Sequence, residues 1–182
     1  TFQEYEDGFG DPASKASWLG LNRLHLMTNQ TATSLRVIIE SCPFGSIPDQ
    51  ITECTYPVFS VYSADYQYAV DIPQLCTNGN DSNPRYDGWV RWPTDQLGPK
   101  FVAYNNDDTK FNCSNEYKST GWWFYADDGS LCGAANLNGV RFPCGTTTVY
   151  SGYLTWHYDP VENAYMYLRP KGFPNYDQPD EI

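Results

Sequence analysis

The stretch from Asn112 to Gly139 constrains the fold of this chain more than any other part of its sequence. Two cysteines, Cys113 and Cys132, enclose a pair of adjacent tryptophans, Trp122 and Trp123. Turn residues and amides cannot form a core by themselves, whereas two indole rings bury a large apolar area. We therefore expect a loop-rich unit that a disulfide closes around these tryptophans.

The order of the motifs in and around this stretch resembles the C-terminal domain family of fibrinogen. That family shows an acidic loop, an Asn-Cys pair, a glycine before Trp-Trp, a second cysteine and Leu-Asn-Gly. The corresponding residues here are Asp107, Asn112-Cys113, Gly121-Trp122-Trp123, Cys132 and Leu137-Asn138-Gly139. Shorter matches extend the resemblance from the first residue to Pro170, and they are Phe9-Gly10, Trp18-Leu19-Gly20, His25-Leu26, Leu35-Arg36-Val37 and Leu168-Arg169-Pro170.

The resemblance implies an α+β fold with a twisted antiparallel central sheet, two short helices and a disulfide-stapled, loop-rich subdomain. A length of 182 residues agrees with a single domain. We expect residues 1–104 and 153–170 to form the sheet part, 105–152 the binding subdomain and 171–182 an extended tail. The family's opening subdomain does not precede residue 1, so we expect it to be cut off, absent or supplied by a second chain.

Local patterns predict two helices. Thr1 and Glu4 form a capping box for the first, and Gly8 ends it. The second helix is predicted from Trp18 to Met27, with Ser17 as its cap. The residues that we expect on its inner face are Trp18, Leu21, Leu24 and Met27. We interpret His25, on this helix, as a structural, hydrogen-bonded residue.

Strands are predicted where β-branched and aromatic residues gather. The segment from Leu35 to Ile39 should be well buried, and the last strand should return to the central sheet as the family implies. The predicted strands are 35–39, 57–62, 66–70, 100–104, 153–156 and 165–169. Residues 71–100 consist mostly of turn formers, which we expect Trp89 and Trp92 to anchor.

Composition excludes several classes of partner. The chain has 11 Lys and Arg against 22 Asp and Glu, a net charge of −11. Nucleic acids and anionic lipids are bound by basic patches, so we expect neither as a partner. The sequence also holds no apolar stretch long enough to span a membrane. Calcium, basic proteins and neutral sugars remain compatible with this charge.

Six cysteines predict three disulfides and a secreted, extracellular protein. The predicted pairs are Cys113–Cys132, Cys42–Cys54 and Cys76–Cys144. The resemblance implies the first. Cys42–Cys54 is predicted because these cysteines bracket a short turn-rich stretch. Cys76–Cys144 is predicted because these are the two cysteines that remain. A zinc site is the alternative, but the chain lacks the usual Cys and His spacings.

Three Asn-x-Ser/Thr sequons bear on secretion as well, at Asn29, Asn80 and Asn112. We expect Asn29 and Asn80 to be glycosylated, because both lie in turn-rich polar stretches. Asn112 adjoins a half-cystine at the centre of the loop-rich unit. We expect it to be bare, because a glycan there would compete with packing.

The resemblance also implies a calcium site. In the family, two aspartates two residues apart bind Ca²⁺ together with backbone carbonyls. Asp107 matches the first aspartate, Asp108 lies beside it, and Thr109 stands where the second belongs. Because calcium needs six to eight oxygens, weak binding or none is expected here. The alternative is a solvated acidic turn.

For the ligand site, the resemblance implicates Glu116, Tyr117, Gly133 and Tyr150, while Ser151 stands where fibrinogen itself has an aspartate. These residues suit small neutral ligands such as sugars or acetyl groups. The predicted function is therefore a secreted recognition module for a carbohydrate or a protein. The alternative is a structural protomer of an extracellular assembly. Catalysis is not expected, because no nucleophile or zinc-protease motif occurs.

Overall fold

The computed structural model describes residues 1–14, 16–41, 43–45, 50–77, 87–89, 97–125, 132–148, 150 and 152–172. Several predictions therefore lie outside the described residues, namely those for Cys42, Asn80, Trp92, Ser151 and the tail from 173 to 182.

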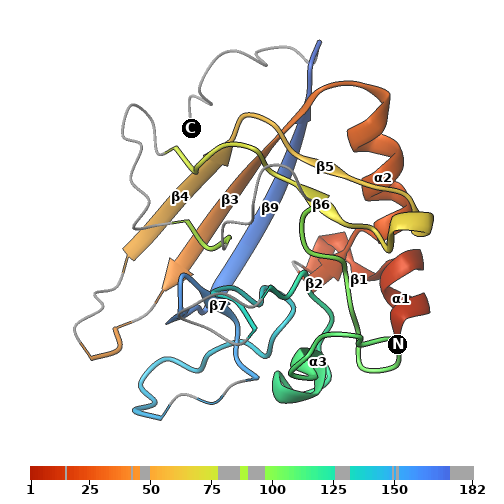
Figure 1. Cartoon of the computed structure of the whole chain (residues 1–182). Coiled ribbons are helices and arrows are strands. Elements are labelled where there is room, and N and C mark those ends of the chain that lie inside the picture. The colour runs from red at the N-terminus through yellow and green to blue at the C-terminus, as the bar shows by residue number, and fades with distance from the viewer. Residues whose placement is uncertain are drawn as a thin grey trace.

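The centre of the fold is a three-stranded antiparallel sheet in the order β4-β3-β9 (Figure 1). Its strands are β3 (Thr33–Ser41), β4 (Gln50–Tyr56) and β9 (Asn163–Pro170). On β3, Leu35, Val37 and Ile39 are buried and alternate with half-buried residues, so one face of the strand forms the core. The predicted return of the last strand to the central sheet is confirmed by its full pairing with β3.

The two predicted helices correspond to α1 (Phe2–Asp7) and α2 (Leu21–Gln30). The capping box at Thr1 and the end of α1 at Gly8 are confirmed. The start predicted for α2 is wrong, because Ser17 and Trp18 belong to β2 (Ala16–Trp18), which pairs with β1 (Phe9–Asp11). Gly20, at φ 100°, separates this hairpin from the helix. Leu21 and Leu24 face the core as predicted, whereas Met27 is exposed.

The remaining elements are short: η1 (Pro12–Ser14), β5 (Ser60–Val61), η2 (Ala64–Tyr66), β6 (Val70–Asp71), α3 (Cys113–Glu116), β7 (Thr155–Trp156) and β8 (Asp159–Pro160). The predicted strand 66–70 is wrong, because Gln67 and Tyr68 adopt left-handed φ angles of 51° and 50°. That conformation buries the Tyr68 ring and lets its hydroxyl bond Asn22 (2.6 Å). Three other predicted strands are shorter than expected. Of residues 57–62 only β5 is a strand, of 100–104 only Val102 forms a bridge, and of 153–156 only β7 is a strand.

The disulfides confirm one predicted pair and correct two. Cys113 is bonded to Cys132 as expected, but Cys54 is bonded to Cys76, and Cys144 is also disulfide-bonded. The sequence reasoning overlooked β4. In the ladder Cys54 faces Val37, in the middle of β3. Because Cys54 is bonded to Cys76, the predicted local bridge to Cys42 is wrong.

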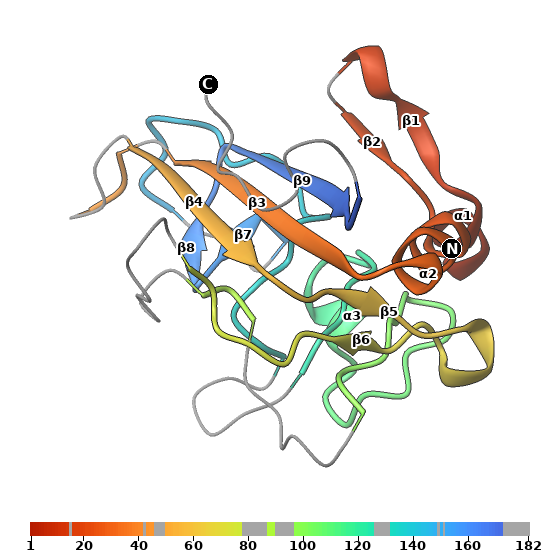
Figure 2. The same cartoon turned by 90° about the horizontal axis from the view of Figure 1, so that it is seen from above.

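One apolar core joins the sheet to the loops. Trp122 and Trp123 are almost fully buried, and Trp89 stacks on Trp122 with ring centroids 5.4 Å apart. The predicted anchoring role of Trp89 is confirmed. Figure 2 shows that the β1–β2 hairpin stands away from the sheet on the side of β9, while α3 lies on the opposite side of the sheet.

Candidate functional site

Side-chain hydrogen bonds hold the loop-rich region, by which we mean the described residues from 105 to 158. Asn136 is fully buried, and its side chain pairs with the Thr120 hydroxyl at 3.1 Å. Its backbone exchanges two hydrogen bonds with Thr155. Asn138 donates to the Gly121 carbonyl (2.8 Å), next to the tryptophan pair. The Leu-Asn-Gly motif therefore positions the tryptophans.

A second network begins at the acidic loop and caps α3. One Asp107 carboxylate oxygen accepts hydrogen bonds from the Thr109 amide (2.9 Å) and hydroxyl (2.5 Å). The other accepts one from the Ser114 amide (2.6 Å). The Thr109 hydroxyl in turn accepts one from the Cys113 amide (2.9 Å). Because the first amides of a helix have no partner within the helix, these side chains satisfy them from outside.

These contacts do not fit the calcium site that the family resemblance implies. Both oxygens of Asp107 already accept protein donors. Asp108 instead forms an exposed ion pair with Lys100 (3.3 Å). Among the described residues, no three acidic, histidine or cysteine side chains converge. Calcium takes six to eight oxygens, whereas in this structure the Asp107 carboxylate is used to join the loop to α3 through Thr109 and Ser114.

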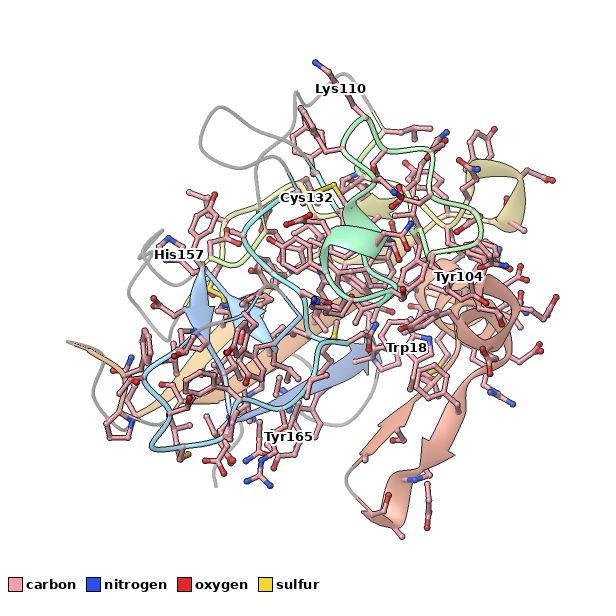
Figure 3. The ribbon with its side chains drawn as sticks, turned by 90° about the horizontal axis from the view of Figure 1, so that it is seen from below. Trp18, Tyr104, Lys110, Cys132, His157 and Tyr165 are labelled. Atoms are coloured by element: carbon pink, nitrogen blue, oxygen red, sulfur yellow. A yellow bond between two sulfur atoms is a disulfide. The ribbon has the colours of Figure 1, made fainter. Side chains whose placement is uncertain are left out.

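Two of the predicted ligand residues, Glu116 and Tyr117, lie at the end of α3. Glu116 is exposed, whereas Tyr117 is half-buried and stacks on Phe124 with centroids 5.2 Å apart. Burial raises the pKa of the Tyr117 hydroxyl, and the nearby Tyr158 and Glu116 raise it further. The Cys113–Cys132 disulfide fixes α3 at its first residue, and Figure 3 shows Cys132 beside this helix.

Gly133 is buried with φ 92°, a backbone conformation that favours glycine. The next residue, Ala134, accepts a hydrogen bond from the amide of Tyr158 (2.8 Å). Tyr158 therefore belongs to the candidate site, although the sequence analysis missed it. It is half-exposed and comes close enough to Tyr117 to affect its pKa.

The position of Tyr158 depends on an unusual turn. His157 and Tyr158 join β7 to β8, and their φ angles are 51° and 68° (Figure 3). Two-residue hairpin turns need positive φ at both positions, and Asn-Gly is preferred there. A bulky residue in this conformation is strained, and such strain concentrates at functional sites. Because this turn contains no Asn-Gly pair, it could not be recognised from the sequence.

The fourth predicted residue, Tyr150, is exposed and packs on Tyr153 with centroids 5.7 Å apart. Gly152, two residues after Tyr150, lies against the side chain of Lys118, which follows Tyr117 in the sequence. The approach is so close that a Cβ added at Gly152 would lie 2.2 Å from that side chain. We take Glu116, Tyr117, Gly133, Tyr150 and Tyr158 as the candidate site. We call these five residues the tyrosine surface.

The two histidines lie apart from one another. His25 has the structural role that we predicted, because its Nδ1 lies 2.8 Å from the Val61 carbonyl. His157 lies in the β7–β8 turn, where its ring packs on Tyr158.

A family model described as the C-terminal globular domain of fibrinogen beta and gamma chains matches residues 1–171. The chain therefore belongs to this family, and the family predicted from its motifs is confirmed. Angiopoietin-4 of Mus musculus is 27% identical over 177 residues, covering 94% of this chain and 31% of its own length. Fibrinogen-like protein 1 of Bos taurus is 28% identical and covers 94% of this chain and 55% of its own length. The chain thus spans between a third and about half of these relatives.

Solved structures agree on the fold. The fibrinogen-like globe domain of human ANGPTL6 matches 93% of this chain and 70% of its own with a TM-score of 0.72 at 24% identity. Lamprey fibrin D-dimer, solved with the peptide Gly-His-Arg-Pro-amide, gives a TM-score of 0.65 at 23% identity, covering 93% of this chain and 56% of its own. The predicted α+β class is confirmed. Within the described residues, every helix is too short or too polar to cross a bilayer.

Proposed function

We propose that this chain is a secreted fibrinogen-like recognition module that binds an extracellular carbohydrate or protein through the tyrosine surface. The observation that carries the proposal is the convergence of Tyr117 and Tyr158 beside Gly133, on loops fixed by a disulfide. Rigid aromatic side chains offer large contact area at small entropic cost, which is what a recognition surface needs.

The chemistry of the surface favours a neutral ligand group. Three of the five residues are tyrosines, and Glu116 is the one acidic side chain among them. The family's pocket aspartate is replaced by Ser151 in the sequence. Tyrosine rings stack on the apolar faces of sugars, and their hydroxyls hydrogen-bond to neutral polar groups. We therefore propose sugars or acetyl groups ahead of amines.

Binding rather than catalysis is proposed. The His25 imidazole is engaged by the Val61 carbonyl, away from the tyrosine surface. Tyrosines dominate the surface, and the acid–base groups beside them are the exposed Glu116 and His157, whose ring packs on Tyr158. The sequence holds no nucleophile or zinc-protease motif that would accompany them.

The test compares two tyrosines of nearly equal exposure, Tyr158 (50%) on the tyrosine surface and Tyr167 (52%) on β9. Retention of the chain would be measured on immobilised N-acetylated and neutral hexoses and on the peptide Gly-His-Arg-Pro-amide. We expect the wild type to bind at least one of the sugars and Tyr158→Ala to lose tenfold or more of this affinity, while Tyr167→Ala keeps it. The proposal would be refuted if the wild-type chain is retained on none of the probes, or if both variants lose the same amount of sugar affinity.

A second candidate function, assembly, is favoured by the free edge of β9. Lys171 donates to the Ala32 carbonyl at 2.7 Å, so by antiparallel alternation the backbone groups of Ala164, Met166 and Leu168 point away from β3. In the described residues these groups have no backbone partner, and their side chains are only partly buried. An unpaired edge of this length accepts another strand.

A cavity of about 1060 Å³ lies along this edge, between β9 and the β1–β2 hairpin. Its apolar lining includes Phe9, Trp18, Leu137, Met166 and Leu168. A second copy, pairing β9 with β9, would continue the sheet across a twofold axis. Sedimentation over a hundredfold concentration range distinguishes the two candidates. A chain that stays monomeric throughout would exclude assembly through β9. A dimer that forms in the wild type and is lost in Met166→Pro would support it.

A further inference from the structure

Two described sequon asparagines, Asn29 and Asn112, differ in what their side-chain nitrogens bind. That nitrogen is the atom to which an N-linked glycan attaches. Its surroundings in the folded chain decide whether a glycan can be tolerated.

The nitrogen of Asn29 is fully engaged. It donates to the Val61 carbonyl at 2.7 Å and to the His25 carbonyl at 2.9 Å, which uses both of its hydrogens. The bond to Val61 joins α2 to β5, which are packed against each other, and the bond to His25 lies within α2. A glycan would replace one hydrogen and place a sugar ring between the two elements. The hydrogen bond lost from the asparagine nitrogen would cost the fold stability.

Asn112 presents the opposite case. Both asparagines are exposed, so the difference lies in their contacts. The φ angle of Asn112 is 53°, in the left-handed region that asparagine tolerates. Asn112 occupies the N-cap position of α3, yet its side chain makes no capping bond, because Asp107 and Thr109 satisfy the helix instead. Its side-chain oxygen accepts a hydrogen bond from Asn115 at 2.7 Å. The nitrogen has no hydrogen-bond acceptor among the described residues, so a substituent on it displaces no protein contact.

We propose that Asn112 carries the N-glycan and that Asn29 does not. In the reaction, the Asn112 side-chain nitrogen would form a bond to the anomeric carbon of a lipid-linked sugar diphosphate. The bond from that carbon to phosphate oxygen breaks, the diphosphate leaves, and the nitrogen loses one proton without any redox change. The Ser114 hydroxyl of the sequon is buried and donates to the Thr120 carbonyl, so transfer precedes the folding of α3. The contacts of the folded chain therefore select which glycosylated chains fold and are secreted, and a chain with a glycan on Asn29 is selected against.

This assignment reverses the sequence-based expectation for two of the three sequons. That expectation assumed that the neighbouring half-cystine buries Asn112. The disulfide is buried, but the asparagine before it faces solvent. A glycan here would border the tyrosine surface, because Asn112 and Glu116 lie one helical turn apart and are joined by a backbone hydrogen bond of 3.1 Å.

The test is site occupancy in secretory cells. The chain would be expressed behind a cleavable secretion signal, as wild type, Asn112→Gln, Asn29→Gln and Thr31→Ala, which removes only the Asn29 sequon. Glycopeptide mass spectrometry after enzymatic deglycosylation in heavy-oxygen water reads each site. We expect Asn112 to be labelled and Asn29 to be unlabelled. Thr31→Ala and Asn29→Gln should leave the glycosylation pattern unchanged, and Asn112→Gln should remove one glycan.

Occupancy is also read on the chain retained inside the cells, so that poor secretion of a variant still gives a result. A bare Asn112 in the wild type would overturn the proposal. An Asn29 occupied to the same extent as Asn112 would overturn it equally, since it would show that the hydrogen bonds to Val61 and His25 do not exclude a glycan.

Discussion

The central sheet and the loop-rich region are held by different kinds of interaction. In the sheet, backbone hydrogen bonds align β4, β3 and β9, and Leu35, Val37 and Ile39 supply an apolar face. In the loop-rich region, side chains bond the backbone directly. Asp107 accepts hydrogen bonds from backbone amides, Asn138 donates one to a backbone carbonyl, and Cys113–Cys132 closes the loop.

The difference shows where each region tolerates change. A backbone ladder survives the loss of most polar side chains, because the chain itself makes the bonds. A loop whose amides are satisfied by side chains fails when one of those side chains is removed, because a buried donor is then left unpaired. Binding residues benefit from the second arrangement, since it holds irregular backbone in place without covering it.

The largest expected effect tests whether the two regions form one cooperative unit. Trp122→Ala should lower the free energy of unfolding by about 3–5 kcal/mol and Leu35→Ala by about 2–5 kcal/mol, because each leaves a cavity. Both residues belong to one apolar cluster. Urea unfolding followed by tryptophan fluorescence and circular dichroism should therefore show one shared transition in each variant. Separate transitions for the two probes would divide the molecule into independent halves.

The two described disulfides sharpen the comparison, because their loops are of similar length, with sequence separations of 22 and 19. Replacing either pair by alanine should cost about 3 kcal/mol by loop entropy. The functional effects should differ. Removing Cys113–Cys132 should abolish sugar retention, whereas removing Cys54–Cys76 should leave it intact at temperatures where both variants are folded. The same loss of retention in both would show that the loop disulfide has no local role.

Asp107→Ala should destabilise the chain by about 1–3 kcal/mol, because amides of Thr109 and Ser114 lose their acceptor. Its neighbour is the control. Asp108→Ala removes only an exposed ion pair to Lys100 and should cost well under about 1 kcal/mol. Thermal unfolding in chelator measures both. Equal effects would indicate that the loop is a solvated acidic turn, as the sequence allowed.

Alkaline pH should weaken the loop-rich region through Tyr117. Burial raises the pKa of its hydroxyl above the ordinary value of about 10, so folding favours the neutral form. This contribution is complete below about pH 10 and is lost as the pH rises through the folded pKa. Tyr117→Phe should reduce the loss of stability above pH 10 without changing stability at pH 7, while Tyr150→Phe serves as an exposed control. An unchanged alkaline slope in Tyr117→Phe would contradict this account.

Local rules predicted the parts of the fold that depend on local interactions. Thr1 and Glu4 lie three residues apart, so their capping box could be recognised from sequence. The apolar residues of β3 and the tryptophan pair were likewise sufficient to place a strand and a core. The disulfide partner of Cys54 could not be predicted in this way, because it depends on the register of β4, which is set by contacts between distant residues.

The candidate site was predicted in part by the family resemblance, which implicated Glu116, Tyr117, Gly133 and Tyr150. Tyr158 was missed because its place depends on a left-handed turn made by His157 and Tyr158, neither of which is a turn residue by preference. The capping role of Asp107 was also missed. Its partner Ser114 lies seven residues away, beyond the spacing of any local capping motif.

The claim that side chains rather than a metal hold the loop-rich region is tested most directly by amide hydrogen exchange at Cys113 and Ser114. These amides donate to Thr109 and Asp107. The exchange rates would be measured in chelator and again in millimolar Ca²⁺. We predict that both amides are protected to the same degree in the two conditions, and that Asp107→Ala exposes Ser114. Protection that arises only when Ca²⁺ is added would show that the ion, and not this network, orders α3 and the tyrosine surface.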